Sequence, residues 1–362
     1  MLDISIQSAQ PLAVFGVAFA ISALGLLMYL CLLTRHLIWD LPNRSNAMHT
    51  KPTPRIGGLV MAVAVVTAVL TLSSTGLPKM LALAACMLLV VSIFDDRWQL
   101  SPALRMAIHL AAASLATWFW IYSFTSLYRA DSGWEWAASP IGAVILILAV
   151  TWMTNLYNFM DGADGMAGGM AIFGFGSYAL VAYNTQGSTD MMLLSAALAG
   201  AAVGFLLFNF SPAKVFMGDA GSIPLGFLAA ILGIQGSLVS AWHWWFPLLV
   251  FSPFIVDATV TLLKRLWVRK KIWLAHRDHY YQRLILAGWS HRRTALTYYL
   301  IMLGTSASAI IAETGGFEVP SMGIEGVILT TWVVIYVLLI CWSEWRFKQI
   351  IKMKSKKTTG IS

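Results

Sequence analysis

Eleven long apolar segments, separated by short polar stretches, constrain the fold of this chain more than any other feature of its sequence. Of its 362 residues 59% are hydrophobic and only 11% are charged, which is typical of a protein that crosses the membrane many times. We therefore predict an all-α, polytopic membrane protein with about 11 transmembrane helices, forming one membrane domain over residues 1–362. The predicted spans are residues 11–33, 57–72, 79–94, 102–124, 140–156, 166–183, 191–208, 223–241, 244–267, 294–312 and 323–342.

The basic residues predict the orientation of these spans. If the N-terminus lies outside, 22 of the 24 Lys and Arg residues fall in inner segments, and only Lys79 and Arg129 fall outside. Because cytoplasmic loops are enriched in Lys and Arg, this asymmetry predicts an outer N-terminus and a cytoplasmic C-terminus. The net charge of +8 belongs to these loops, so it does not indicate nucleic-acid binding. The three cysteines, Cys31, Cys86 and Cys341, lie inside apolar segments, which argues against a disulfide framework or a zinc site.

Five carboxylates lie in three clusters, each at the cytoplasmic end of a predicted span. They are Asp95 and Asp96 in FDDRWQL, Asp161 and Asp164 in NLYNFMDGADGMAGG, and Asp219 in VFMGDAGS. A carboxylate at a membrane boundary loses hydration and gains little unless it meets a cation, a partner or a substrate. Three clusters at one boundary therefore predict one site, assembled from several helices, that handles a metal and phosphates.

The first and third clusters each allow a second interpretation. Asp95 and Asp96 point about 100° apart if they share a helix, so we expect one acid to face the site and the other to orient a partner such as Arg97. The alternative is a solvated helix end, although negative charge is unfavourable at a helix C-terminus. Asp219 is flanked by glycines, which leave room for Mg²⁺ and phosphate oxygens around its carboxylate. Its alternative role is the N-cap of the next helix.

The second cluster is the densest. Asn155, Asn158 and Asp161 recur every three residues, and Asp164 follows at the same spacing, which keeps these side chains near one face of a helix. The glycines after both acids allow the chain to turn and a ligand to approach the backbone. The next helix is expected to begin near Gly165, where its free amides can receive phosphate. The alternative is an Asx-rich turn between two spans.

Two inner loops supply cations. His276, His279 and Arg283 can share a helix face in the largest loop, and imidazole and guanidinium groups suit a diphosphate or a sugar phosphate. The alternative is a basic loop lying against anionic lipid. In the first inner loop Lys51 can contact phosphate, although an ordinary positive-inside loop explains it equally well.

Asp257 is an acid inside the ninth predicted span. An ionisable residue within a span is a candidate functional residue. It is equally well explained as a structural partner of Lys264 or Arg265, which follow it in the same segment.

Taken together, these motifs resemble the polyprenyl-phosphate N-acetylhexosamine-1-phosphate transferases, glycosyltransferase family 4. The matching stretches cover most of the chain, from Asp40 to about Arg283, and are DLPNRSNAMHTKPTPRIGG, DDRWQL, NLYNFMDGADGMAGG, NFSPAKVFMGDAGS and HRDHYYQRL. The HxxHxYQRL form is most similar to the bacterial branch that initiates O-antigen synthesis. It departs from the triple-histidine run of the muramyl-pentapeptide branch.

The resemblance implies a reaction in which polyprenyl phosphate and a UDP-N-acetylhexosamine give polyprenyl diphosphate-sugar and UMP. It implies Mg²⁺, with Mn²⁺ as the alternative, held by Asn158 and Asp219. Asp95 would act on the lipid phosphate or help to hold the metal, and Asp96 would support the site. The other implied residues are Asp161 and Asp164, which position water, nucleotide or sugar; Asn209 and Phe216, which contact uracil; and Lys51, His276, His279 and Arg283, which bind phosphate or sugar.

The resemblance also implies a location and partners. The active site would lie on the cytoplasmic face of a bacterial inner membrane, in loops at about 34–56, 95–101, 157–165, 209–222 and 268–293. We expect the prenyl chain beside the ninth span, near Pro253 and Trp267. Downstream glycosyltransferases are implied partners, and the sequence does not decide between a monomer and a homodimer. Two rival hypotheses are an ion-coupled transporter and an inactive lipid-binding relative; clustering of the acids at one surface favours the enzyme.

Overall fold

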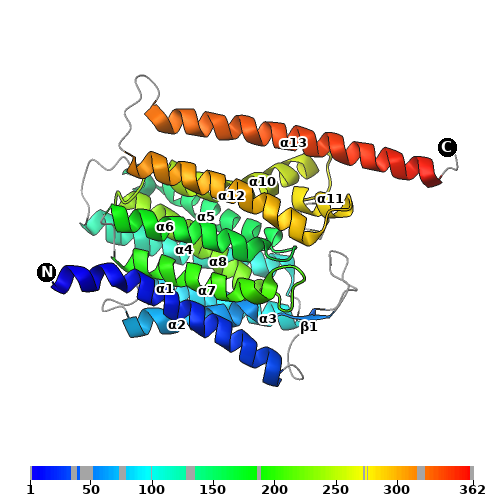
Figure 1. Ribbon diagram of the computed structural model, residues 1–362. Coiled ribbons are helices and arrows are strands. Elements are labelled where there is room, and N and C mark those ends of the chain that lie inside the picture. The colour runs from blue at the N-terminus through cyan, green and yellow to red at the C-terminus, as the bar shows by residue number, and fades with distance from the viewer. Residues whose placement is uncertain are drawn as a thin grey trace.

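Long α-helices running side by side make up most of this computed structural model (Figure 1). The structure describes residues 2–33, 39–40, 52–72, 79–98, 100–127, 135–185, 189–271, 274, 276–315 and 323–358. The α-helices of this described part are α1 (Leu2–Met28), α2 (Gly57–Leu72), α3 (Lys79–Trp98), α4 (Pro102–Leu127), α5 (Pro140–Met160), α6 (Met166–Asn184), α7 (Thr189–Asn209), α8 (Asp219–Leu238), α9 (Trp245–Val250), α10 (Ser252–Trp267), α11 (Tyr280–Leu286), α12 (His291–Thr314) and α13 (Gly323–Thr358). A π-helical turn, Tyr29–Leu33, continues α1, and a 3-10 turn, Glu135–Ala138, precedes α5.

The predicted all-α membrane fold is confirmed. A helix forms over every predicted apolar segment, and seven helices of the described chain are long and apolar enough to cross a membrane. These seven lie at Ala9–Leu32, Pro140–Met160, Met166–Asn184, Thr189–Asn209, Asp219–Leu238, His291–Thr314 and Gly323–Gln349. The chain is therefore a multi-pass membrane protein.

The ninth predicted span differs from expectation because it is two helices. The six-residue α9 ends at Val250, and α10 begins at Ser252. Pro253 lies in the first turn of α10, where its missing N–H and fixed φ are accommodated. The continuous apolar pattern of residues 244–267 concealed this break.

Close packing at the centre of the bundle depends on small residues. The buried helix α7 packs against α1, α2 and α6. A Cβ atom added at Gly200 would lie 2.2 Å from the carbonyl oxygen of Phe15, and one at Gly204 would lie 2.6 Å from that of Phe19. This spacing of two glycines four residues apart lets two membrane helices approach backbone to backbone.

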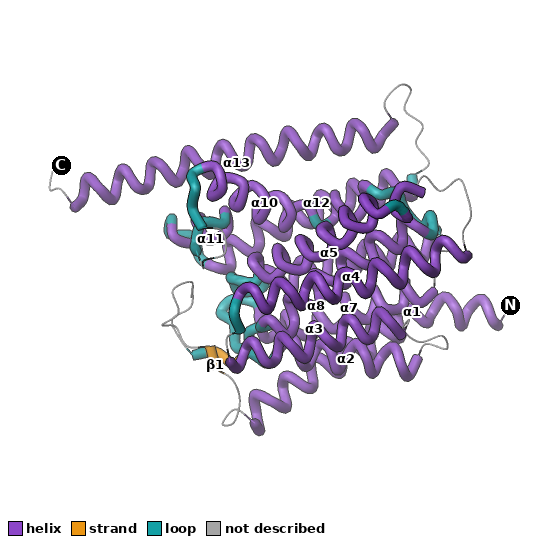
Figure 2. The backbone as a smooth tube through the Cα atoms, turned by 180° about the vertical axis from the view of Figure 1, so that it is seen from behind, coloured by secondary structure: helices purple, strands orange, loops and turns teal. Residues whose placement is uncertain are grey.

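The two ends of the bundle are unlike. The N-terminus of α1 lies at one end, and the C-terminal part of α13 extends past the other, where α11 and β1 also lie (Figures 1 and 2). The strands β1 (Trp39–Asp40) and β2 (Thr53–Pro54) form a short antiparallel pair. Side chains from all three predicted acidic clusters lie at this end, and the contacts between the clusters are described below.

Candidate active site

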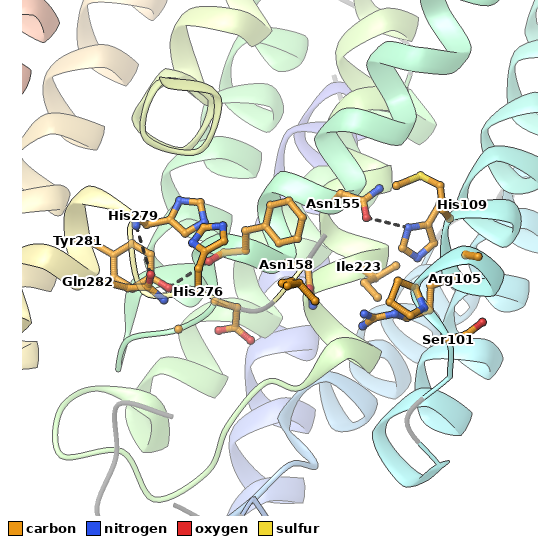
Figure 3. A pocket seen from close by; sticks show the side chains of 17 residues that line it. Ser101, Arg105, His109, Asn155, Asn158, Ile223, His276, His279, Tyr281 and Gln282 are labelled. Carbon is orange, nitrogen blue, oxygen red and sulfur yellow. Dashed lines mark hydrogen bonds between the residues drawn. The ribbon is translucent and has the colours of Figure 1, made fainter. Parts of the chain in front are cut away.

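A cavity of about 700 Å³ opens at the end of the bundle where α11 lies (Figure 3). Its lining comes from the start of α4, the end of α5, the first turn of α8 and the segment that leads into α11. The lining residues are Ser101, Pro102, Ala103, Arg105, Met106, His109, Asn155, Asn158, Phe159, Asp161, Gly162, Ile223, Leu274, His276, His279, Tyr281 and Gln282. Its size lies within the usual range for small-molecule sites.

Two residues of the lining, Arg105 and Asn158, contact carboxylates that lie beside the cavity and come from distant parts of the chain. Asp95, in the last turn of α3, is 6% exposed. It accepts a hydrogen bond from the Leu100 amide at 2.7 Å and one from Arg105 Nη1 at 3.0 Å. The same Nη1 lies 3.8 Å from an oxygen of Asp219. One guanidinium therefore lies between two carboxylates and offsets the cost of bringing them together.

Asp219 is positioned by the irregular segment that precedes α8. Phe216 donates its backbone N–H to Pro54 at 2.8 Å and accepts from the Gly57 N–H at 3.0 Å, so this segment is tied to β2 and to the start of α2. Gly218 then adopts a φ of 72° and α8 begins at Asp219. A positive φ is readily adopted only by glycine, which explains why glycine precedes the acid.

Asn158 on α5 connects the second and third acidic clusters. Its amide Nδ2 donates to Asp219 Oδ1 and to the Ser222 hydroxyl, both at 2.9 Å. One turn earlier, Asn155 Oδ1 lies 3.2 Å from His109 Nδ1 on α4. The three-residue spacing seen in the sequence therefore brings Asn155, Asn158 and Asp161 to one cavity. We name the side chains of Asp95, Arg105, Asn158 and Asp219 the acid wall. Arg105 and Asn158 line the cavity, and Asp95 and Asp219 contact these two side chains from outside the lining.

Asp164 lies behind the cavity. Its carboxylate accepts from the Ala213 amide at 3.2 Å and lies 3.2 Å from His291 Nδ1. Burial is the largest single influence and opposes ionisation, but His291 together with hydrogen bonds from Ala213 and Ser211 outweighs it, so the pKa of Asp164 is lowered. The next residue, Gly165, has a φ of 78° and begins α6. Asp164 thus fastens the turn that carries Asp161.

The opposite wall is made by His276, His279 and Gln282, which we name the histidine wall. The rings of His276 and His279 stack with centroids 5.0 Å apart. Burial, followed by the positive charge of neighbouring groups, lowers the pKa of His276 to about 4. His276 is therefore a neutral hydrogen-bonding group near pH 7. Gln282 Oε1 accepts from the His279 amide at 3.3 Å and so helps to begin α11.

Comparison with known proteins gives a consistent result. The profile of glycosyl transferase family 4 matches residues 78–237. A probable undecaprenyl-phosphate N-acetylglucosaminyl 1-phosphate transferase of Bacillus subtilis is 31% identical, over 82% of this chain and 85% of its own. The chain belongs to glycosyl transferase family 4.

Two other relatives of this family-4 transferase differ in their named substrates. A decaprenyl-phosphate N-acetylglucosaminephosphotransferase of Mycolicibacterium smegmatis is 29% identical over 75% of both chains. A phospho-N-acetylmuramoyl-pentapeptide-transferase of Levilactobacillus brevis is 28% identical over 71% of this chain and 83% of its own. The relatives are transferases, and their names divide between two amino-sugar donors.

Several predicted site residues of the transferase do not reach the cavity. Arg283 contacts Glu344 of α13 and lies over the rings of Tyr280 and Phe347. Asn209 is buried, accepts from the Gly165 amide at 2.9 Å and donates to the Val215 carbonyl at 2.8 Å. Its described contacts are therefore structural.

Phe216 is placed by the backbone pairing with residues 54–57 and is not among the cavity-lining residues. Lys51 and the side chain of Asp96 lie outside the described residues.

Arg105, His109 and Gln282 are cavity residues that the sequence motifs did not indicate. Arg105 and His109 are four residues apart on α4, which places them on one helix face. The sequence does contain a signal for Arg105, namely a charged residue one turn into an otherwise apolar helix. The positive-inside rule accounts for this charge equally well, so the signal does not by itself indicate a site residue. Gln282 lies inside the HxxHxYQRL stretch and could have been selected with its histidines.

The donor atoms of the acid wall are hard. Asp95, Asp219 and Asn158 offer carboxylate and amide oxygens, and the neighbouring Ser222 offers a hydroxyl; oxygen atoms of this kind are the ligands of hard cations such as Mg²⁺. Within the described part of the chain no group of three or more His, Cys, Asp or Glu side chains is placed to hold a metal ion. A Mg²⁺ site commonly uses only one or two protein carboxylates, with substrate phosphates and water as the other ligands, so the two carboxylates here fit such a site.

Proposed function

We propose that this protein transfers an N-acetylhexosamine 1-phosphate from a UDP-sugar to polyprenyl phosphate. An oxygen of the lipid phosphate attacks the sugar-linked phosphorus of the donor, the bond to the bridging oxygen breaks, and UMP leaves. Polyprenyl diphosphate-sugar is the product. The observation that carries the proposal is a cavity lined on one side by Arg105 and Asn158, which contact the carboxylates of the acid wall, and on the other by the histidine wall. The chain is also 31% identical to a relative named for this type of transfer.

The acid wall fits a divalent cation, and we propose Mg²⁺, with Mn²⁺ as the alternative. Asp219 and Asn158 would hold it, with Asp95 beside them. When bound, the cation neutralises the charge of the phosphates and orients them. The position of Arg105 between the two carboxylates supports this assignment, because it shows that the wall attracts positive charge.

The remaining side chains bind and orient. Arg105 is within reach of both carboxylates and can form a charge-assisted, two-point hydrogen bond with a phosphate. His276, neutral near pH 7, offers hydrogen bonds to sugar or diphosphate. A lipid phosphate is an anionic nucleophile, with a second pKa near about 6 by analogy with phosphate monoesters. A strong general base is therefore not required, and Asp95 needs only to orient the phosphate or the cation.

The lipid chain is expected to remain outside the cavity. Apolar side chains of α10 and the segment after it are turned outward: Leu263, Leu266 and Val268 are exposed, and Trp267 is 89% exposed. Leu274, which lines the cavity, is exposed as well. We propose that the prenyl chain lies along this face. A photoactivatable prenyl phosphate should cross-link here; cross-links confined to α1 and α7 would contradict this part of the proposal.

We further propose that the protein resides in a bacterial inner membrane with its cavity on the cytoplasmic face, where it would initiate O-antigen or other cell-envelope polysaccharide synthesis. The distribution of Lys and Arg supports this orientation. N-acetylglucosamine is the first sugar to test, because it is named for two of the relatives.

Release of UMP tests the proposal. Purified protein would be given undecaprenyl phosphate, Mg²⁺ and, in turn, UDP-N-acetylglucosamine, other UDP-N-acetylhexosamines and the muramyl-pentapeptide donor. Turnover with one donor that stops on chelation supports the proposal and identifies the sugar. Folded protein that releases no UMP with any donor would contradict it and would favour the transporter or the inactive relative.

A further inference from the structure

Asp257 is a buried acid that none of the proposed steps uses. It lies in the middle of α10 and is 4% exposed. The two basic residues that the sequence offered as partners are engaged elsewhere: Lys264 contacts Glu344 at 2.6 Å, and Arg265 contacts Asp278. The alternative in which Asp257 pairs with one of them is therefore not the arrangement observed, and its negative charge is balanced by other groups.

Those groups belong to the beginning of α11 and to α12. The backbone amides of Tyr280 and Tyr281 donate to the two carboxylate oxygens at 2.9 and 3.1 Å. The Tyr298 hydroxyl donates to Oδ2 at 2.5 Å. A carboxylate that receives several such bonds can remain buried. Asp257 therefore fixes the position and direction of the first turn of α11.

This first turn carries the histidine wall. His279 is the residue immediately before α11, is 2% exposed and lines the cavity. Its Nδ1 lies 3.5 Å from Asp257 Oδ1. The distance is slightly too long for a good hydrogen bond, but bonds of this kind often tighten when substrate binds.

Further contacts also hold α11. Tyr281 donates its hydroxyl to the Phe159 carbonyl at 3.0 Å, which ties α11 to the end of α5 beside Asp161. Glu344 of α13 contacts Arg283, Lys264 and the Tyr280 hydroxyl, away from the cavity. Two carboxylates thus hold the same short helix, but only Asp257 touches a residue of the cavity.

We propose that Asp257 is a positioning residue for His279, an inference that rests on the function proposed above. As an acceptor beside Nδ1, it favours a proton on that nitrogen and leaves Nε2 as the ring nitrogen available to the diphosphate or sugar. Such a second group behind a working imidazole fixes both its orientation and its tautomer. Asp257 itself touches no substrate.

A double-mutant cycle tests this proposal. Asp257→Asn keeps the volume but cannot accept from both amides and the tyrosine, and we expect kcat/KM for UMP release to fall about 10–100-fold. His279→Ala should produce a loss of similar size. Because Asp257 acts through His279, the double variant should be no slower than His279→Ala alone within about 3-fold. Multiplicative losses, or an Asp257→Asn protein with parental rates, would overturn the proposal.

Glu344→Gln is the matched control, since it removes the other carboxylate that holds α11. We expect its turnover to stay within about 3-fold of the parent. Tyr298→Phe, which removes one hydrogen bond and keeps the carboxylate, should cause a smaller loss than Asp257→Asn. A loss with Glu344→Gln equal to that with Asp257→Asn would show that any loosening of α11 is sufficient, and would overturn the specific role of Asp257.

A readout independent of activity separates this proposal from the proposed function. Trypsin cleavage between residues 264 and 283, followed by mass spectrometry of the folded protein, reports the order of α11. Asp257→Asn should be cleaved faster than both the parent and Glu344→Gln. If the parent released no UMP with any donor, the proposed function would fail, and unchanged cleavage in Asp257→Asn would then also reject the positioning of α11 by this acid.

Discussion

The acid wall and the histidine wall of the cavity are built in different ways. The acid wall stands on the ends of long helices, α3, α4, α5 and α8, that pack along most of their length. The histidine wall stands on a seven-residue helix and the segment before it, held by Asp257, Tyr281 and Gln282. The acid wall is rigid because long, packed helices hold it, whereas the position of the histidine wall depends on contacts of a few individual side chains.

The largest effect is expected in the acid wall, at Asp219. Asp219→Ala removes the carboxylate that Asn158 and Arg105 both contact. We expect UMP release to fall by at least about 10³-fold, since charge neutralisation supplies most of the catalysis of phosphoryl transfer. Unfolding must be excluded by a parental melting temperature. If the variant retained more than a tenth of the parental rate, the acid wall would not have the catalytic role proposed for it.

The next largest effect is expected at Arg105, the cationic member of the acid wall. Arg105→Ala should lower turnover about 10²-fold by removing a phosphate contact. It should also lower the Mg²⁺ concentration needed for half-maximal rate, because two carboxylates lose the cation that competes for them. Mg²⁺ titrations of UMP release measure both quantities. A higher Mg²⁺ requirement would contradict the placement of the cation beside Asp219 and Asp95.

The contact between α1 and α7 lies outside both walls of the cavity and tests whether turnover depends on general helix packing. Gly200→Ala places a Cβ within 2.2 Å of a backbone carbonyl of α1, so the two helices must move apart. We expect a loss of about 1–3 kcal/mol of stability, seen as a lower melting temperature in detergent. The KM for the UDP-sugar of the folded protein should be unchanged. A changed KM would show that the cavity is sensitive to general packing, and would weaken the contrast between the walls.

The smallest effect concerns His276 and pH. Its pKa is lowered to about 4 in the folded protein, against about 6.5 in the unfolded chain. Between these values the unfolded chain binds the proton and the folded protein does not, so stability falls as pH decreases through this window. Melting temperatures near pH 7 and pH 5 should differ more for the parent than for His276→Gln, by about 1–2 °C, because the ring is partly exposed. Equal differences would contradict a neutral, half-buried His276.

The acid wall was more predictable from the sequence than the histidine wall, for a physical reason. Membrane helices are evident from composition, and polar residues at their ends must meet at one boundary, so the sequence alone is enough to group Asp95, Asn158 and Asp219. The break between Val250 and Ser252 was not predicted, since the residues on both sides of it are apolar and continue one hydrophobic segment.

The role of Asp257 was also beyond reach of the sequence. Its partners are backbone amides more than 20 residues away, which no residue type reveals. Arg105 was visible as a charge, but only the fold shows that it lies between two carboxylates. Arg283 is the converse case: its motif predicts a ligand contact, and in the structure it contacts Glu344 of α13.

The most direct test of the proposed cation site is to locate Mn²⁺ by anomalous scattering in crystals of the protein with a UDP-N-acetylhexosamine. We expect one ion within about 2–2.5 Å of the Asp219 carboxylate, bound to the diphosphate, with the sugar end reaching His276 and His279. An ion held by the two histidines, or no ion beside a bound donor, would contradict the assignment of the acid wall as the cation site.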